Sequence, residues 1–203
     1  MNRIASESER RDEPAPEFVA GSPLLEDAYV FAGGAHAMQL RKGDDSPFIG
    51  HPVTVAHLLD DAGEPEEVVA AALLHDVVEG TGTSRGEIKS RFGDEVCRLV
   101  DALSEDPSIC EYEIRKHALR DQVEAAGERA AAIYAADKLS NLRDLRAAYE
   151  RDGEAAEERF PTPIDTRLAL WRRDLEMVER VAPTLPSLRA LRYELEAFED
   201  LRS

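Results

Sequence analysis

The sequence has few cysteines, no long apolar run and a deficit of basic residues, and each shortage argues against a class of protein. Its two cysteines, Cys97 and Cys110, are too few for a disulfide framework in a chain of 203 residues, and they lack the CxxC spacing of a structural zinc site. No apolar run approaches the ~20 residues needed to cross a bilayer. The N-terminus lacks the apolar core of a secretory signal, so we expect a cytoplasmic protein with reduced thiols.

Basic side chains are outnumbered, because 42 acidic residues face 25 basic ones and the formal net charge is −17. Such a field repels DNA, RNA and anionic lipid, so we expect neither nucleic acid nor a membrane among the partners. A small phosphorylated ligand is compatible with this charge if a local basic cluster or a metal overrides the global field. The oligomeric state cannot be predicted from the sequence.

The sequence also lacks a convincing strand pattern, an internal repeat or a glycine-rich phosphate loop, and its apolar residues recur at helical spacing. We therefore predict an all-α fold. The charged, Pro- and Ser-containing residues 1–22 predict a disordered tail. Residues 23–150 form the predicted main domain, and two amphipathic helices in 151–203 form an extension that packs on it. Expected helices in the main domain span 24–40, 51–62, 66–79, 84–92, 94–103, 112–126 and 128–150.

One stretch, residues 70–79, organises the rest of the chain. It begins as a run that is apolar on every side, typical of a helix buried all round, yet it ends in His75, Asp76 and Glu79. Buried charges are costly unless they are paired or bound to a metal. Spacings of three and four residues allow the three side chains to address one small volume.

Three further polar residues occupy constrained or inward positions. His51 precedes Pro52, which holds it in a defined conformation at the start of a helix. Asp137 and Asn141 share a helical stripe with apolar residues. Two imidazoles and two carboxylates (His51, His75, Asp76, Asp137) suit Mn²⁺, Fe²⁺ or Zn²⁺ better than Ca²⁺ or Mg²⁺. Spacing alone leaves open that the four are independent features of helix ends.

Several segments carry a resemblance to a known family. They are AHAMQLRK (35–42), PFIGHP (47–52), ALLHDVVEGT (72–81), RFG (91–93), LVDAL (99–103) and ADKLSNL (136–142). The pattern resembles the HD-domain metal-dependent phosphohydrolases, and within them the hydrolase domain of the RelA/SpoT alarmone enzymes and their small stand-alone relatives. The resemblance covers about residues 24 to 150 and implies a helical HD-domain bundle.

The resemblance implies roles for individual residues. His51, His75, Asp76 and Asp137 would hold one divalent metal, most readily Mn²⁺, with Fe²⁺ or Zn²⁺ as alternatives. Arg41, Lys42 and Asn141 would contact a small phosphorylated nucleotide, although Arg41 and Lys42 also suit a solvated loop. Glu79 would be the first acid of a catalytic pair. The implied reaction is hydrolysis of guanosine 3′,5′-bis(diphosphate) at its 3′-pyrophosphate by a metal-activated water.

One departure from the family pattern affects this expectation. The family has Asp directly after the catalytic Glu, whereas this chain has Gly80. Either Glu79 acts alone or another acid substitutes. Otherwise the chain hydrolyses a different nucleotide, or it binds metal and nucleotide as a sensor without cutting.

Overall fold

The computed structural model describes residues 15–41 and 46–202, and it is all-α with no strand among these residues. Residues 1–14, most of the predicted tail, lie outside the described part, as does Lys42. Short 3-10 helices occupy Glu17–Val19 (η2) and Gly153–Arg159 (η3). The α-helices are α1 (Pro23–Ala35), α2 (Gly50–Asp61), α3 (Glu66–Leu74), α4 (Val77–Gly80), α5 (Arg85–Leu103), α6 (Tyr112–Ala126), α7 (Glu128–Asp152), α8 (Ile164–Val181) and α9 (Leu188–Leu201).

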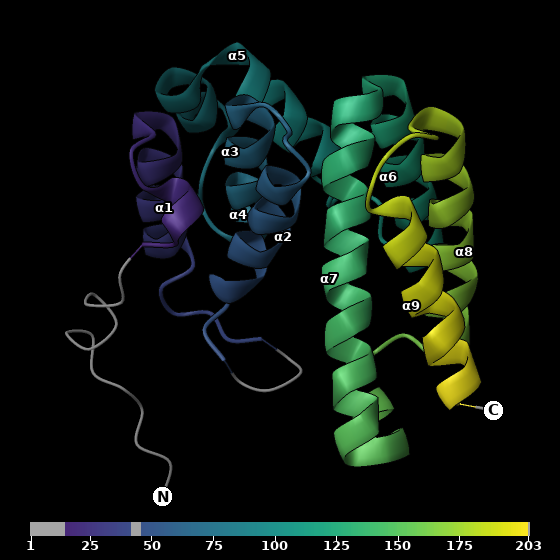
Figure 1. The fold of residues 1–203 in the computed structure, drawn as a ribbon. Coiled ribbons are helices and arrows are strands. Elements are labelled where there is room, and N and C mark those ends of the chain that lie inside the picture. The colour runs from purple at the N-terminus through teal and green to yellow at the C-terminus, as the bar shows by residue number, and fades with distance from the viewer. Residues whose placement is uncertain (1–14, 42–45, 203) are drawn as a thin grey trace, which may run out of the picture.

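Helix α7 is the central helix of the structure. It stands between the helices of the N-terminal half and the C-terminal pair α8 and α9 (Figure 1). It packs against α2, α3 and α5 and also against α6, α8 and α9. Ile133, Leu139 and Leu142 are fully or almost fully buried in these contacts. A polar side chain on α7 that faces α2 and α3 is therefore held in a rigid frame.

Helix α3 is buried all round, as the sequence predicts, since every residue from Val68 to Leu74 is buried. The predicted helix over 66–79 is nevertheless interrupted. It ends at Leu74 and resumes as α4 at Val77, because Asp76 adopts φ −93° and ψ −6° instead of continuing the helix. The interruption places His75 and Asp76 at a turn, beside α2 and α7.

The N-terminal end of the described chain belongs to the fold. Val19 of η2 is fully buried, and the Ser22 hydroxyl caps α1 by accepting a hydrogen bond from the Leu25 N–H at 3.3 Å. The predicted tail therefore stops short of residue 22, because Val19 finds a place in the core. Helix α1 ends at Ala35 instead of near residue 40, and the chain then turns towards a single bridge between Leu40 and Pro47.

The predicted break at Gly93 is present as a kink inside α5, where this glycine has φ +88°. At the other end of the chain, α8 and α9 pack against α7. Buried Glu194 of α9 accepts hydrogen bonds from Arg146 at 2.8 Å and Arg143 at 3.3 Å. These charge-assisted bonds fix the C-terminal pair on the central helix.

Among the described residues, no helix combines the length and apolar character needed to cross a membrane.

Candidate active site

Three helix ends and faces bring four candidate metal ligands together. One donor atom each from His51, His75 and Asp137 lies within 4.8 Å of the other two. His51 Nε2 is 3.0 Å and His75 Nε2 is 3.9 Å from Asp137 Oδ1. Asp76 Oδ2 lies 3.3 Å from His75 Nε2 and 3.8 Å from His51 Nε2. Residues 51, 75, 76 and 137 thus share one small volume, which spacing alone could not show.

The two imidazole rings are oriented by bonds on their far sides. His75 Nδ1 donates to the Ala72 carbonyl at 2.7 Å, and His51 Nδ1 is bonded to the Ser140 hydroxyl at 3.1 Å. Such outer bonds turn the Nε2 atom of a histidine towards a metal. His75 Nε2 is buried and makes no hydrogen bond to the described residues. Its neighbours are the Asp76 and Asp137 carboxylates at 3.3 and 3.9 Å, which are not aligned for a hydrogen bond, and a cation shared by these donors would satisfy them together.

Asp137 is held by two neighbours on its own helix. Its Oδ2 accepts a hydrogen bond from Lys138 Nζ at 2.8 Å, and its Oδ1 accepts one from Asn141 Nδ2. Lys138 is buried and lies 4.2 Å from the centre of the Tyr134 ring. Although burial opposes ionisation, the Lys138 cation and the bonded His51 hold the pKa of Asp137 well below its usual range.

The charges around His75 are those of a cation site. Burial alone would lower the pKa of His75, but the carboxylates of Asp76 and Asp137 outweigh it and raise the pKa to about 9. Burial likewise opposes ionisation of Asp76, and His75 reverses this, lowering the pKa of Asp76 to about 2. Without metal the site therefore holds a proton between carboxylates. The nitrogen and oxygen donors fit a divalent cation in place of that proton.

A cavity of about 740 Å³ opens from the metal-ligand cluster, with His51, Asp76 and Asp137 in its wall. This volume is in the range of small-molecule sites. Five basic side chains line its wall, although the whole chain has a formal net charge of −17. They are Arg41, Lys116, Lys138, Arg151 and Arg167. The cavity therefore provides the local basic cluster that a phosphorylated ligand requires.

Only Arg41 among these cations was predicted from the sequence, and the other four were not. The Arg167 guanidinium lies 4.5 Å from the centre of the Phe160 ring and 5.0 Å from that of Trp171, and its buried Nε makes no hydrogen bond to the described residues. Burial lowers the pKa of Arg167. The sequence did contain a signal for Arg167, because this cation falls between Ile164 and Trp171 on the apolar face of its helix.

Two of the three residues expected to bind substrate line this cavity. Arg41 and Asn141 line it, and Arg41 forms an ion pair with Asp144 of α7. Lys42, the other half of the predicted basic pair, lies outside the described residues. Lys116 comes from α6, far along the chain, where no motif marks it.

Glu79 sits at the edge of the site. Its carboxylate accepts a hydrogen bond from the Glu105 backbone N–H, and it is not among the residues that line the cavity. Burial raises the pKa of Glu79. Next to it, the Gly80 carbonyl accepts a hydrogen bond from Gln39 Nε2 at 2.5 Å. Nearby Glu105 is itself paired with Arg115 and Lys116.

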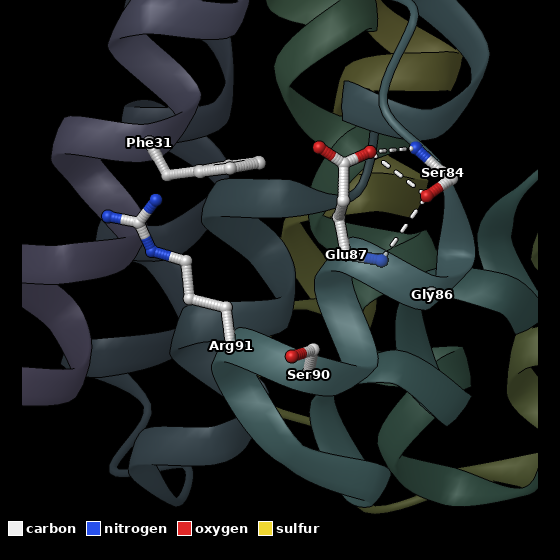
Figure 2. Close-up of a pocket in the computed structure, with 6 residues that line it drawn as sticks. All are labelled: Phe31, Ser84, Gly86, Glu87, Ser90 and Arg91. Atoms are coloured by element: carbon white, nitrogen blue, oxygen red, sulfur yellow. Dashed lines mark hydrogen bonds between the residues drawn. The ribbon is translucent and has the colours of Figure 1, made fainter.

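A second, shallower hollow of about 390 Å³ lies at the N-terminus of α5 (Figure 2). Its polar groups are used within the protein. Ser84 and Glu87 form a capping box, and Arg91 is paired with Asp27. These groups explain the local structure and leave the larger cavity as the candidate site.

The chain belongs to the HD-domain family, since the family model described as "HD domain" matches residues 28–162. It is 42% identical over 125 residues to the human guanosine-3′,5′-bis(diphosphate) 3′-pyrophosphohydrolase MESH1, covering 60% of this chain and 69% of that protein. It is 35% identical over 169 residues to a probable guanosine-3′,5′-bis(diphosphate) 3′-pyrophosphohydrolase of Synechocystis sp.. That match covers 79% of this chain but only 22% of the Synechocystis protein.

Solved structures show the same fold. A metazoan ortholog of SpoT that hydrolyses ppGpp superposes with a TM-score of 0.71 at 27% identity, covering 94% of this chain and 99% of that one. A Listeria monocytogenes protein superposes with a TM-score of 0.68 at 31% identity, covering 73% of this chain and 99% of that one. The first match extends over nearly the whole chain.

Proposed function

We propose that this chain hydrolyses the 3′-pyrophosphate group of guanosine 3′,5′-bis(diphosphate), giving pyrophosphate and guanosine 5′-diphosphate. The observation that carries the proposal is the convergence of the two imidazole Nε2 atoms and the two carboxylates, from residues 51, 75, 76 and 137, at a cavity lined with cations. Relatives at 35–42% identity that carry this activity in their names support the choice of substrate. A cytoplasmic location and the lack of nucleic-acid and membrane partners stay predictions from the sequence.

His51, His75, Asp76 and Asp137 would hold the metal, with Mn²⁺ as the first choice and Fe²⁺ or Zn²⁺ as alternatives. When bound, the cation would supply Lewis-acid chemistry to a water molecule and to a phosphoryl oxygen. Lys138 and Asn141 would keep the Asp137 carboxylate in one orientation. His51 and His75 would keep theirs through Ser140 and Ala72.

The cavity's cations would offset the charge of the phosphate groups. Lys116 and Lys138 lie in its wall together with Asp76 and Asp137, and they would neutralise charge that develops during phosphoryl transfer. Arg41 and Asn141, with Lys42, would bind the nucleotide. Arg167, which lacks a hydrogen-bond partner for its Nε among the described residues, would add a further donor.

Glu79 would accept the proton of the attacking water. Its raised pKa makes its carboxylate a better proton acceptor than an ordinary one. No acid directly follows Glu79, because position 80 is a glycine, whose carbonyl is bonded to Gln39. Glu79 would therefore act alone, with the amide of Glu105 fixing its position.

The test is release of pyrophosphate from guanosine 3′,5′-bis(diphosphate) by the purified full chain with Mn²⁺. Glu79→Gln should lower kcat by ~10²–10⁴-fold, the usual contribution of a general base. Exposed Glu67→Gln in α3 is the matched control and should leave kcat unchanged. Cleavage of other nucleotides but not this one would favour a different phosphohydrolase, and nucleotide binding without any cleavage would favour a sensor.

A further inference from the structure

Glu79, the proposed proton acceptor, belongs to a very short helix. Helix α4 has four residues, and a helix of this length is not stable without support from the rest of the protein. The carbonyl groups at its C-terminal end also lack partners within the helix. The position of Glu79 therefore depends on contacts from other segments. Two hydrogen bonds reach residues 79 and 80 from distant parts of the chain.

The first of these bonds comes from Gln39, in the segment between α1 and α2. Gln39 Nε2 donates to the Gly80 carbonyl at 2.5 Å, so this side chain caps the C-terminal end of α4. On the other side of the same amide, Gln39 Oε1 lies 2.9 Å from His36 Nδ1. An amide oxygen only accepts hydrogen bonds, so His36 donates from a protonated Nδ1.

His36 fixes the orientation of the Gln39 amide. Its ring is 2% exposed and packs against the Phe48 ring at 4.8 Å between centroids. If the amide turned over, its oxygen would face the Gly80 carbonyl oxygen and its NH₂ group would face the His36 N–H. Both contacts would be repulsive. The Gln39 donor is therefore held towards α4.

The second bond comes from the Glu105 backbone N–H, which donates to the Glu79 carboxylate. The carbonyl of the same peptide group belongs to Ser104, and it accepts a hydrogen bond from Gln122 Nε2 of α6 at 3.0 Å. Gln122 Nε2 also donates to the Asp101 carbonyl at 2.7 Å, so both amide protons are used. Gln122 thus fixes the direction of the Glu105 N–H, and hydrogen bonds in series strengthen one another.

The chain has two glutamines, and each holds one of the groups that contact residues 79 and 80. An uncharged amide suits this task. A lysine or arginine in its place would lower the pKa of Glu79 and weaken it as a proton acceptor, and an ionised acid could not donate. Resting on the proposed function, we propose that Gln39 and Gln122 are positioning residues that hold Glu79 from two sides.

Replacing either glutamine by methionine keeps the length of the side chain and removes its donors. A reacting group misplaced by about 1 Å can cost ~10²-fold in rate, so we expect each of Gln39→Met and Gln122→Met to lower kcat roughly 10- to 100-fold. KM and bound Mn²⁺ should stay unchanged, because neither substitution removes a proposed ligand of the metal or the nucleotide. Gln122 is exposed, so Gln122→Met should fold normally.

The experiment combines these variants with Glu79→Gln in the Mn²⁺-loaded full chain, with guanosine 3′,5′-bis(diphosphate) as substrate. If the glutamines act by positioning Glu79, their replacement should have no further effect on kcat once residue 79 cannot accept a proton. A general structural effect would instead lower kcat by the same factor in both backgrounds. The double variant of Gln39→Met and Gln122→Met should not fall below Glu79→Gln.

Arg98→Met is the matched control. Arg98 Nη1 also donates to a carbonyl at a helix end, that of Ala126 in α6, at 3.3 Å, and neither residue lines the cavity. It should leave kcat unchanged. An unchanged kcat in either glutamine variant, or an equal loss of kcat in the Glu79→Gln background, overturns the inference. A rise in KM alone for Gln39→Met also overturns it, because this cavity-lining amide would then bind the nucleotide.

Amide hydrogen exchange separates this inference from the proposed function, because it needs no turnover. In Gln39→Met the Gly80 N–H, which donates to the Asp76 carbonyl at 2.8 Å, should exchange roughly two- to tenfold faster, as expected for the loss of one hydrogen bond. In Gln122→Met the Glu105 N–H should respond in the same way. Faster exchange at these amides in a wild type that cleaves no substrate supports the positioning and refutes the proposed function. Unchanged exchange at both amides, with cleavage by the wild type, refutes the positioning and leaves the proposed function intact.

Discussion

The substitution Gly80→Asp tests whether the missing acid limits catalysis. The family resemblance has Asp at this position, directly after Glu79. A Cβ at residue 80 would lie 3.6 Å from Gln39 Oε1 and 3.6 Å from His36 Cε1, which are ordinary van der Waals contacts. Gly80 is the last residue of α4 and does not need a left-handed conformation. The aspartate should therefore be accommodated without strain.

The expected gain in rate can be bounded. A positioned general acid or base contributes ~10²–10⁴-fold, so partial restoration should raise kcat at least tenfold on guanosine 3′,5′-bis(diphosphate). The effect on folding should be small. Asp is a better helix former than Gly by only a few tenths of a kcal/mol, and the new charge beside Glu79 and Asp76 acts in the opposite direction. A large change in melting temperature is not expected.

The assay is steady-state turnover with saturating Mn²⁺, run beside Gly82→Asp. Gly82 lies two residues further on, with nothing within 4 Å of its Cβ position and no left-handed backbone requirement. The substitution Gly82→Asp adds the same charge nearby, but not at residue 80, where the family has its aspartate. An equal kcat for wild type and Gly80→Asp, with unchanged metal content, would refute the idea that an acid at residue 80 joins the catalytic machinery. Glu79 alone would then suffice.

Four further predictions concern the metal and the nucleotide. His75→Ala should reduce bound Mn²⁺ steeply, since it removes one of the four clustered donors, and metal analysis showing full occupancy would contradict the site. Because folding raises the pKa of His75 from 6.5 to about 9, the metal-free protein should lose stability as pH rises from 6.5 through 9. Chelation should lower the melting temperature, most strongly at high pH, where the proton no longer replaces the metal, and thermal scans with and without Mn²⁺ would check both. Arg41→Ala should weaken nucleotide affinity in calorimetry without changing metal content, and unchanged affinity would indicate a solvated arginine.

The all-α fold was accessible from the sequence because apolar residues repeat at helical spacing. Helix α6 begins and ends where that spacing predicts, at Tyr112 and Ala126. The interruption at His75 and Asp76 was not accessible, since each residue from 66 to 79 is compatible with a continuous helix. At the turn His75 contacts His51 of α2 and Asp137 of α7, and such contacts between distant segments are absent from any local pattern. The same holds for Val19, whose burial depends on a core assembled from later helices.

The proposed metal ligands could be predicted from the sequence, whereas most of the basic residues in the cavity wall could not. His51, His75, Asp76 and Asp137 stand out because polar residues at buried or constrained positions are unusual. Lys116 and Arg167 reach the cavity from α6 and α8, and their chain positions carry no motif. Arg167 could have been suspected as a cation on an apolar helix face. Lys116 becomes visible only when the helices are placed side by side.

The geometry of α7 links the two proposed parts of the site. Asp137, Asn141, Asp144 and Ala148 follow one another at three- and four-residue steps along one wall of the cavity. A single rigid helix therefore sets the distance between the metal-ligand cluster and the part of the wall that would face the nucleotide. One residue inserted between Asn141 and Asp144 would rotate Asp144 by about 100° away from the cavity while leaving Asp137 in place. A change of register should then weaken nucleotide binding without removing metal binding, whereas loss of both would show that the two parts are not independent.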